Sequence, residues 1–223
     1  MSKARFLTNP DLNQLATHLD RLRADMTSGD PEMLASRTGT QYQPLSQEQG
    51  AFHFNLLGQS VLLTYPFWTV LDAQTNQSLP LPLQALALYY FTHADGFPLE
   101  LRWVSFADLP DGRFYNQAYQ GYTGRELGRV FQNDLEAFSR AAGMAGGILL
   151  PRDREAPGDR AFIFHTLPRV SLLTAYWLGD EDFPASAQVL FQASSPHYLP
   201  TDVCAFLGST LTRRLIKFKP PSE

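Results

Sequence analysis

Cysteine is almost absent from this sequence, and its scarcity excludes several kinds of site. Among 223 residues the only thiol is Cys204, which has no second cysteine with which to form an internal disulfide. One cysteine also cannot hold a zinc ribbon or an iron–sulfur cluster, because both need several thiolate ligands. A chain without disulfides suits a reducing compartment, so we expect a cytoplasmic protein.

Charged residues and long apolar runs are also scarce. Charged side chains make up 18% of the chain, and 22 acidic against 18 basic residues give a net charge of −4. A mildly acidic chain has no overall attraction to nucleic acid or to an anionic membrane, so we predict neither as a partner. The basic start, residues 1–10, is not followed by the apolar stretch of a signal peptide. No apolar run reaches the roughly 18 residues that a membrane-spanning helix needs, so we expect a soluble protein.

Hydrophobic residues, in contrast, are plentiful at 44%, and their spacing in the first half predicts helices followed by strands. Asn9-Pro10-Asp11 and Asp30-Pro31-Glu32 are both typical of helix starts, with a capping residue before a proline. From Gly50 the apolar residues alternate with polar ones, which predicts an antiparallel meander whose third strand runs from Phe67 to Leu71. A helix is then predicted from Pro82.

The second half repeats this order. Thr123 and Glu126 have the spacing of a capping box, and apolar residues at helical period predict one helix from there to Gly143. Two strands are predicted at 161–166 and 170–178, and a helix at about 201–218. Both strands are apolar on nearly every residue, so we expect both of their faces to be covered.

The order of elements predicts the fold class. We find no repeat, no low-complexity linker and no shift of composition along the chain. The pattern therefore favours one α+β domain over residues 1–223, with a mixed or antiparallel sheet and flanking helices. Residues 1–49 are predicted to be a helical N-terminal extension, and residues 50–219 the core.

The first candidate site is the acidic turn Asp180-Glu181-Asp182, at the end of the second predicted strand. Three carboxylates in a turn can bind a hard cation such as magnesium or calcium through their oxygens. The spacing lacks the central glycine and the distal glutamate of a calcium loop. Asp182 before Phe183-Pro184 is also typical of a helix cap. We therefore predict no metal site and keep a divalent metal as the alternative.

His165 and Arg169 flank a proline corner between the two strands. A histidine at a strand end can act as a general base, and an arginine beside it can hold an anion. The structural alternatives are a buried histidine bonded to a backbone carbonyl, and an arginine paired with Asp180 or Asp182. The candidate catalytic residues are thus His165, Arg169, Asp180 and Asp182.

A second candidate site is rich in aromatic residues and begins at Phe114, with Arg113 and Arg125 close by. Rings beside arginines can stack a flat ligand, although such rings also cover the edge of a core. The candidate ligand-binding residues are Arg113, Tyr115, Tyr119 and Tyr122.

Cys204 is a third candidate, because it lies near the start of the last predicted helix. The pKa of a thiol can fall at a helix start, and His197 is the nearest histidine in the sequence. A lone helical cysteine is more commonly a packing residue. The chain carries no phosphate loop, Rossmann glycine pattern, serine elbow or His-Glu-x-x-His motif.

Several segments together resemble a known family. They are Leu167-Pro168-Arg169, Trp177-Leu-Gly-Asp-Glu-Asp-Phe183-Pro184, Val189-Leu-Phe191 and His197-Tyr-Leu199, with Trp103-Val-Ser-Phe106 and Gly143-Met-Ala-Gly-Gly147 upstream. From about Gly50 onward the chain resembles the uncharacterised prokaryotic family catalogued as domain of unknown function three-seven-eight-six. The resemblance implies a shared fold and a cytoplasmic protein. It brings no activity or catalytic residue with it. Some members of the family carry a cysteine-rich iron–sulfur module, but this chain lacks those cysteines, so we predict no iron–sulfur cluster and no other cofactor.

These observations leave open whether the protein is an enzyme. We predict a non-catalytic accessory module that binds a small molecule or a protein partner. The alternative is a hydrolase or transferase that uses the acidic turn, with or without a divalent metal. The 13% of aromatic residues can also leave an exposed apolar patch, so a homo-oligomer is a further expectation.

Overall fold

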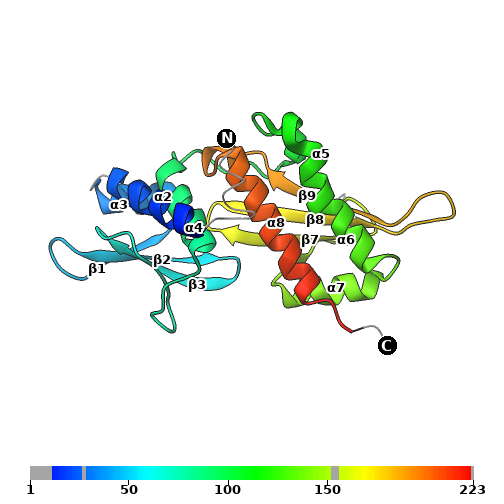
Figure 1. Cartoon of the computed structure of the whole chain (residues 1–223), viewed down its shortest axis with the longest axis horizontal. Coiled ribbons are helices and arrows are strands. Elements are labelled where there is room, and N and C mark those ends of the chain that lie inside the picture. The colour runs from blue at the N-terminus through cyan, green and yellow to red at the C-terminus, as the bar shows by residue number, and fades with distance from the viewer. Residues whose placement is uncertain (1–11, 27–28, 152–155, 222–223) are drawn as a thin grey trace. The chain divides into compact units, whose positions relative to one another are not determined.

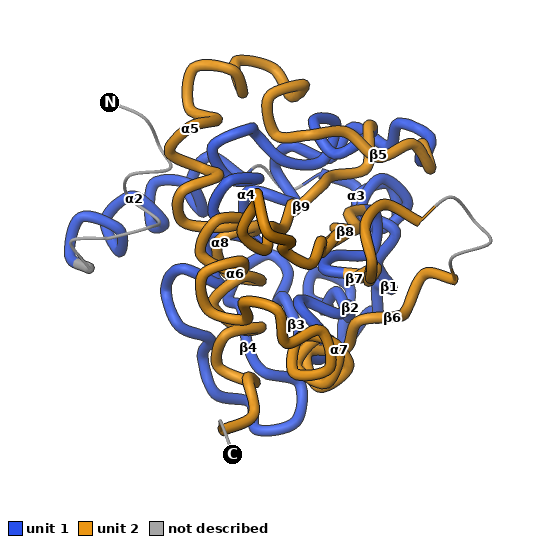
Figure 2. Tube along the Cα trace, turned by 90° about the vertical axis from the view of Figure 1, so that its right-hand side faces the viewer, with its two compact units in different colours: residues 1–99, 166–169, 194–206 blue, residues 100–165, 170–193, 207–223 orange. Residues whose placement is uncertain are grey.

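The computed structural model describes residues 12–26, 29–151 and 156–221. The chain divides into two compact units, each assembled from segments that are distant in the sequence (Figure 2). Unit 1 comprises residues 1–99, 166–169 and 194–206. Unit 2 comprises residues 100–165, 170–193 and 207–223.

Unit 1 combines helices with a four-stranded antiparallel sheet whose strand order follows the sequence (Figure 1). Its helices are α2 (Leu12–Asp25), α3 (Pro31–Thr38) and α4 (Leu81–His93). Its strands are β1 (Gln41–Pro44), β2 (Gly50–Leu56), β3 (Gln59–Tyr65) and β4 (Val70–Asp72). The short 3-10 helix η3 (Ser195–His197) and the first residues of α8 (Thr201–Lys217) also belong to this unit.

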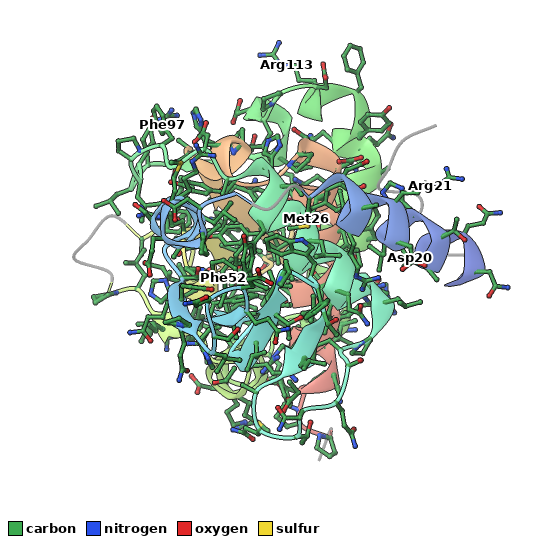
Figure 3. The ribbon with its side chains drawn as sticks, turned by 90° about the vertical axis from the view of Figure 1, so that its left-hand side faces the viewer. Asp20, Arg21, Met26, Phe52, Phe97 and Arg113 are labelled. Carbon is green, nitrogen blue, oxygen red and sulfur yellow. The ribbon has the colours of Figure 1, made fainter. Side chains whose placement is uncertain are left out.

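Local sequence signals account for several of these elements. Asp30 caps α3 as predicted, because its Oδ1 accepts a hydrogen bond from the backbone N–H of Glu32 at 3.0 Å. The cap predicted at Asn9–Asp11 lies outside the described residues. In β2 the alternating pattern directs Phe52 into the core, where its ring meets that of Phe91 at 4.9 Å between centroids (Figure 3). A contact between aromatic rings therefore forms part of the core of unit 1.

Two predictions in this unit need correction. The third strand was predicted from Phe67, but β4 begins at Val70, because Trp68 has a φ of 56° and its N–H donates to Thr64 in a turn. The stretch predicted as a helical extension also contains strand β1. Tyr42 of β1 lies opposite Phe52, with ring centroids 5.0 Å apart, so a long-range contact rather than a local pattern defines this strand.

Unit 2 contains a five-stranded antiparallel sheet of order β5-β9-β8-β7-β6. The strands are β5 (Trp103–Val104), β6 (Ile148–Leu149), β7 (Arg160–Leu167), β8 (Val170–Trp177) and β9 (Ser186–Gln192). Its helices are the 3-10 helix η1 (Phe106–Asp108), α5 (Gly112–Tyr122), α6 (Gly124–Phe131) and α7 (Leu135–Met144), together with the later part of α8. The last two residues of β7 are counted with unit 1.

The core of unit 2 lies against β8, which is buried along nearly its whole length, as its apolar sequence predicts. Tyr176 of β8 stacks on Phe138 of α7, with 4.5 Å between ring centroids. The α+β class is therefore confirmed, but the strands form two antiparallel sheets rather than one. Among the described residues, no helix is both long and apolar enough to span a membrane.

The helix predicted from Thr123 to Gly143 is instead two helices, α6 and α7. The chain turns at Gln132, which has a φ of 50°, and Asp134 then caps α7 by accepting the N–H of Ala137 at 2.7 Å. The prediction of a capping box at Thr123 is also wrong, because the Thr123 hydroxyl donates to the carbonyl of Tyr119 at 2.5 Å. A serine or threonine hydroxyl can bond backward in this way and leave the next helix uncapped.

Candidate functional site

A groove of about 690 Å³ lies within unit 2, between α6 and the connection from β8 to β9. We call it the α6 groove. Residues from both sides line it, among them Gly124, Arg125, Gly128, Arg129, Asp180 and Phe183. This volume falls in the range of about 300–1,000 Å³ typical of small-molecule sites.

Two glycines allow α6 to lie close to the start of β9. A Cβ atom on Gly124 would lie 2.1 Å from the carbonyl oxygen of Ala187, and one on Gly128 would lie 2.5 Å from that of Ala185. Contacts this short are far below van der Waals separation, so any larger residue would force the helix away from the strand. The Gly-x-x-x-Gly spacing therefore places Arg125 and Arg129 at the groove.

The opposite side of the groove is a turn that the carboxylate of Asp180 holds together. Its Oδ1 accepts hydrogen bonds from the backbone N–H groups of Asp182 at 2.9 Å and Phe183 at 2.8 Å. Asn133 fixes the start of the same turn, since its Oδ1 accepts the N–H of Gly179 at 2.7 Å and its Nδ2 donates to the Gly179 carbonyl. The turn is thus tied at both ends by side chains.

The prediction that Asp182 caps a helix is wrong. Residues 183–185 are not helical, and the chain continues into strand β9 at Ser186. Asp182 is exposed in the turn, and the carboxylate that accepts backbone hydrogen bonds is that of Asp180. Within the described ranges, no group of three or more His, Cys, Asp or Glu residues is arranged to hold a metal ion.

The charges at the groove differ in how far they are neutralised. Arg129 makes a two-pronged ion pair with Glu126, with its Nη2 2.6 Å from Oε1 and its Nε 2.9 Å from Oε2. These hydrogen bonds lower the pKa of the Glu126 carboxyl below its usual range. Arg125 is exposed and has no hydrogen bond or ion pair with any other described residue. The side chain of Phe183 is 70% exposed.

His165 belongs to unit 2, and its side chain is exposed. Its Nδ1 lies 2.9 Å from the hydroxyl of Ser171 on β8. The alternative of a buried histidine is therefore wrong. Its place among the candidate catalytic residues rests on its chemistry alone.

Arg169 belongs to unit 1 and is held by contacts there. Its Nη2 donates to the carbonyl of Ser36 and its backbone N–H to the hydroxyl of Tyr90, each at 3.1 Å. Its Nε is buried and has no hydrogen-bond partner in the part of the chain that the structure describes. The aliphatic part of its side chain lies against Gly39, the left-handed residue that ends α3. These contacts give Arg169 a role in joining the 166–169 segment to the rest of unit 1.

The four candidate ligand-binding residues on α5 do not share one environment. Tyr119 is fully buried and stacks on Phe106 with 4.2 Å between ring centroids, so it is a core residue. Tyr115, Tyr122 and Arg113 are exposed, and Figure 3 shows the Arg113 side chain directed away from α5. The aromatic segment therefore has one buried ring and an accessible face.

Cys204 lies in the interior of unit 1, where burial raises the pKa of its thiol. A raised pKa is the opposite of what a nucleophilic thiol needs. Its Sγ is 3.7 Å from the carbonyl oxygen of Leu199, and the Nδ1 of His197 is instead bonded to Asp95 at 2.7 Å. The environment is that of a packing residue.

Sequence reasoning identified Asp180 but not the groove that it lines. In the sequence Arg125 stands out only as a neighbour of the aromatic segment, and no local pattern gives the two glycines of α6 a role. The available signal was the repeated Gly-Arg pair at 124–125 and 128–129, four residues apart on one helix. The role of these glycines depends on their contact with the start of β9, about 60 residues later in the chain.

The comparisons with known proteins give a family and no function. Residues 30–214 match the family described as domain of unknown function (DUF3786), and the chain belongs to that family. The match begins 20 residues before Gly50, so it includes α3 and β1. Neither the curated proteins nor the solved structures include a significant match.

Proposed function

We propose that this member of the DUF3786 family is a cytoplasmic, non-catalytic module that binds a small molecule in the α6 groove. The observation that carries the proposal is that an exposed ring, Phe183, lines one hollow of suitable volume together with Arg125, whose guanidinium has no partner among the described residues. An apolar surface with a few convergent polar groups is the usual composition of a ligand site.

The arrangement of the acidic turn favours binding over catalysis. Asp180 uses its Oδ1 to hold two backbone N–H groups of its own turn, so this carboxylate has a structural task. The arginines at the groove are permanent cations, which bind anions but do not exchange protons at neutral pH. The described residues that line the groove include no histidine or cysteine, so its charges support recognition of a ligand rather than a hydrolase or transferase.

A ligand screen against a blocked groove tests the proposal. Ser186 is an exposed residue of β9 that lines the groove, whereas Gln188, two residues further along the same face, does not. We expect Ser186→Trp to fill the groove and Gln188→Trp to leave it open. Ligand-observed NMR with a diverse library of small metabolites should find compounds that bind the wild-type protein and Gln188→Trp but not Ser186→Trp.

The opposite result would remove the proposal. If no compound binds, or if the bound compounds are retained by Ser186→Trp, the α6 groove is not the ligand site. Circular dichroism of both tryptophan variants provides the necessary check, since equal melting temperatures exclude misfolding as the cause of a loss.

A further inference from the structure

The α6 groove carries one charge of each sign that forms no ion pair with another described residue, and these two charges restrict the kind of ligand that fits. We propose that its ligand is a small zwitterion: a molecule with a carboxylate, a protonated amine and an apolar, aromatic body. The inference rests on the proposed function and names its ligand class. It depends on Arg125, Asp180 and Phe183, which all line the groove.

The positive partner is Arg125 rather than Arg129. The Nη2 and Nε of Arg129 already donate hydrogen bonds to the two carboxylate oxygens of Glu126, at 2.6 and 2.9 Å. Arg125 makes no such bond within the described part of the chain, so its planar fork of N–H donors is available. That fork matches the geometry of a carboxylate, which it binds through two parallel hydrogen bonds.

The negative partner is the second oxygen of Asp180. Its Oδ1 accepts two backbone hydrogen bonds, while its Oδ2 makes none with the described residues. The carboxylate is therefore oriented before a ligand arrives, and ordering it costs little conformational entropy. A protonated amine donates to Oδ2 without disturbing the bonds that hold the turn.

The apolar part of the ligand has its counterpart in Phe183. The backbone of this residue is bonded to Asp180 at both its N–H, 2.8 Å from Oδ1, and its carbonyl, 2.9 Å from the Asp180 nitrogen. The same turn thus fixes the base of the ring and the position of the carboxylate. An exposed ring in a hollow offers its face to another ring, which favours an aromatic body.

The balance of charge excludes ligands with a single charge. Because the ion pair of Arg129 with Glu126 cancels internally, Arg125 and Asp180 leave the groove with one charge of each sign. A simple anion would pair with Arg125 but approach a carboxylate, and a simple cation would have the reverse problem. A zwitterion satisfies both charges, and this difference provides specificity.

Three forms of one dipeptide test the inference. Phenylalanyl-phenylalanine is a zwitterion with aromatic side chains, its N-acetyl derivative keeps only the carboxylate, and its C-terminal amide keeps only the amine. Titrations by NMR chemical shift on the full chain at pH 7 should show the zwitterion binding at least tenfold more tightly than either blocked form.

Two substitutions assign the charges. Arg125→Gln should abolish the preference for the zwitterion over the amide, and Asp180→Asn should abolish the preference over the N-acetyl form. Asparagine keeps an oxygen that can accept the two backbone hydrogen bonds, so the turn remains intact. Arg140→Gln is the control, because it removes an exposed arginine of unit 2, on α7, that does not line the groove. It should leave both preferences unchanged.

The outcomes separate the ligand class from the binding function. Equal affinity for all three forms, or preferences that Arg125→Gln and Asp180→Asn leave intact, would overturn the zwitterion inference. If the library screen still finds compounds that Ser186→Trp excludes, groove binding stands and only the ligand class is wrong. If neither the dipeptides nor any library compound binds, both proposals fall.

Discussion

At the scale of single residues, Asp95 and His197 connect two segments of unit 1 that are about 100 positions apart. The Nδ1 of His197 lies 2.7 Å from the Oδ2 of Asp95, and the imidazole stacks on Phe97 with 3.8 Å between ring centroids. The hydrogen bond from His197 lowers the pKa of Asp95 below its ordinary value. The contact therefore stabilises the ionised carboxylate in the folded protein.

The lowered pKa predicts how Asp95→Asn changes stability with pH. Because the folded pKa lies below the unfolded value of about 3.9, the contribution of Asp95 is complete above pH 5 and is lost as the pH falls through the folded value. The Asp95 side chain is 54% exposed, so solvent screening limits the effect to about 0.5 kcal/mol. We expect Asp95→Asn to lower the free energy of unfolding by that amount at pH 7 and by almost nothing at pH 3.

Urea denaturation at the two pH values measures this difference. Asp20→Asn is a suitable control, because Asp20 pairs with Arg23 within a single helix and does not join distant segments. A loss for Asp95→Asn that is the same at pH 3 as at pH 7 would show that the ion pair does not contribute in this way.

At the scale of elements, the contact of α6 with β9 makes the strongest demand on the sequence. Gly124→Ala should lower the free energy of unfolding by about 1–3 kcal/mol, because the added methyl group would overlap the Ala187 carbonyl, 2.1 Å away. Gly121→Ala on α5 is the matched control, since no atom lies within 4 Å of its added Cβ. It should raise stability by about 0.5–1 kcal/mol, as expected for alanine in a helix.

Urea denaturation of both variants tests this contact. Opposite signs for Gly124→Ala and Gly121→Ala would confirm that α6 is pressed against the strand. A stabilising effect at both positions would mean that the helix can move away without cost, and the depth of the α6 groove would then not depend on Gly124.

Elements with local signals were predictable, and those defined by distant contacts were not. The Asp30-Pro31 start of α3 and the alternation in β2 are read within a few residues, and both were predicted. The separation of α6 from α7 depends on the positive φ of Gln132, for which its residue type gives no signal. The same distinction holds in the candidate site. Asp180 lies in an acidic turn that is recognisable in the sequence, whereas the role of Gly124 depends on its contact with Ala187.

At the scale of the whole molecule, exposed rings on α5 predict self-association. Phe114 is 84% exposed and Tyr115 is 54% exposed, and they are consecutive residues of the helix. Large exposed apolar side chains next to one another are a common feature of contact surfaces between proteins. We expect sedimentation velocity to show mass that increases with concentration for the wild-type protein, and a reduced effect for the double variant Phe114→Ser, Tyr115→Ser.

Leu101→Ser provides the comparison, because Leu101 is also strongly exposed in unit 2 but does not belong to α5. It should sediment like the wild-type protein. A wild-type protein that remains monomeric at about 100 μM would argue against association through α5, since a contact of this kind is expected to be weak.

The order of segments in the two units has a consequence for how the gene can change. The chain passes from one unit to the other after residues 99, 165, 169, 193 and 206 (Figure 2). A fragment that ends at residue 99 would lack the N–H of Arg169 that binds Tyr90 and the imidazole that binds Asp95. Neither unit is encoded by one continuous stretch of the gene, so the exchange of a single stretch of DNA cannot transfer a whole unit. An exchange of one unit alone would therefore need a separate crossover in the coding sequence at each of these boundaries.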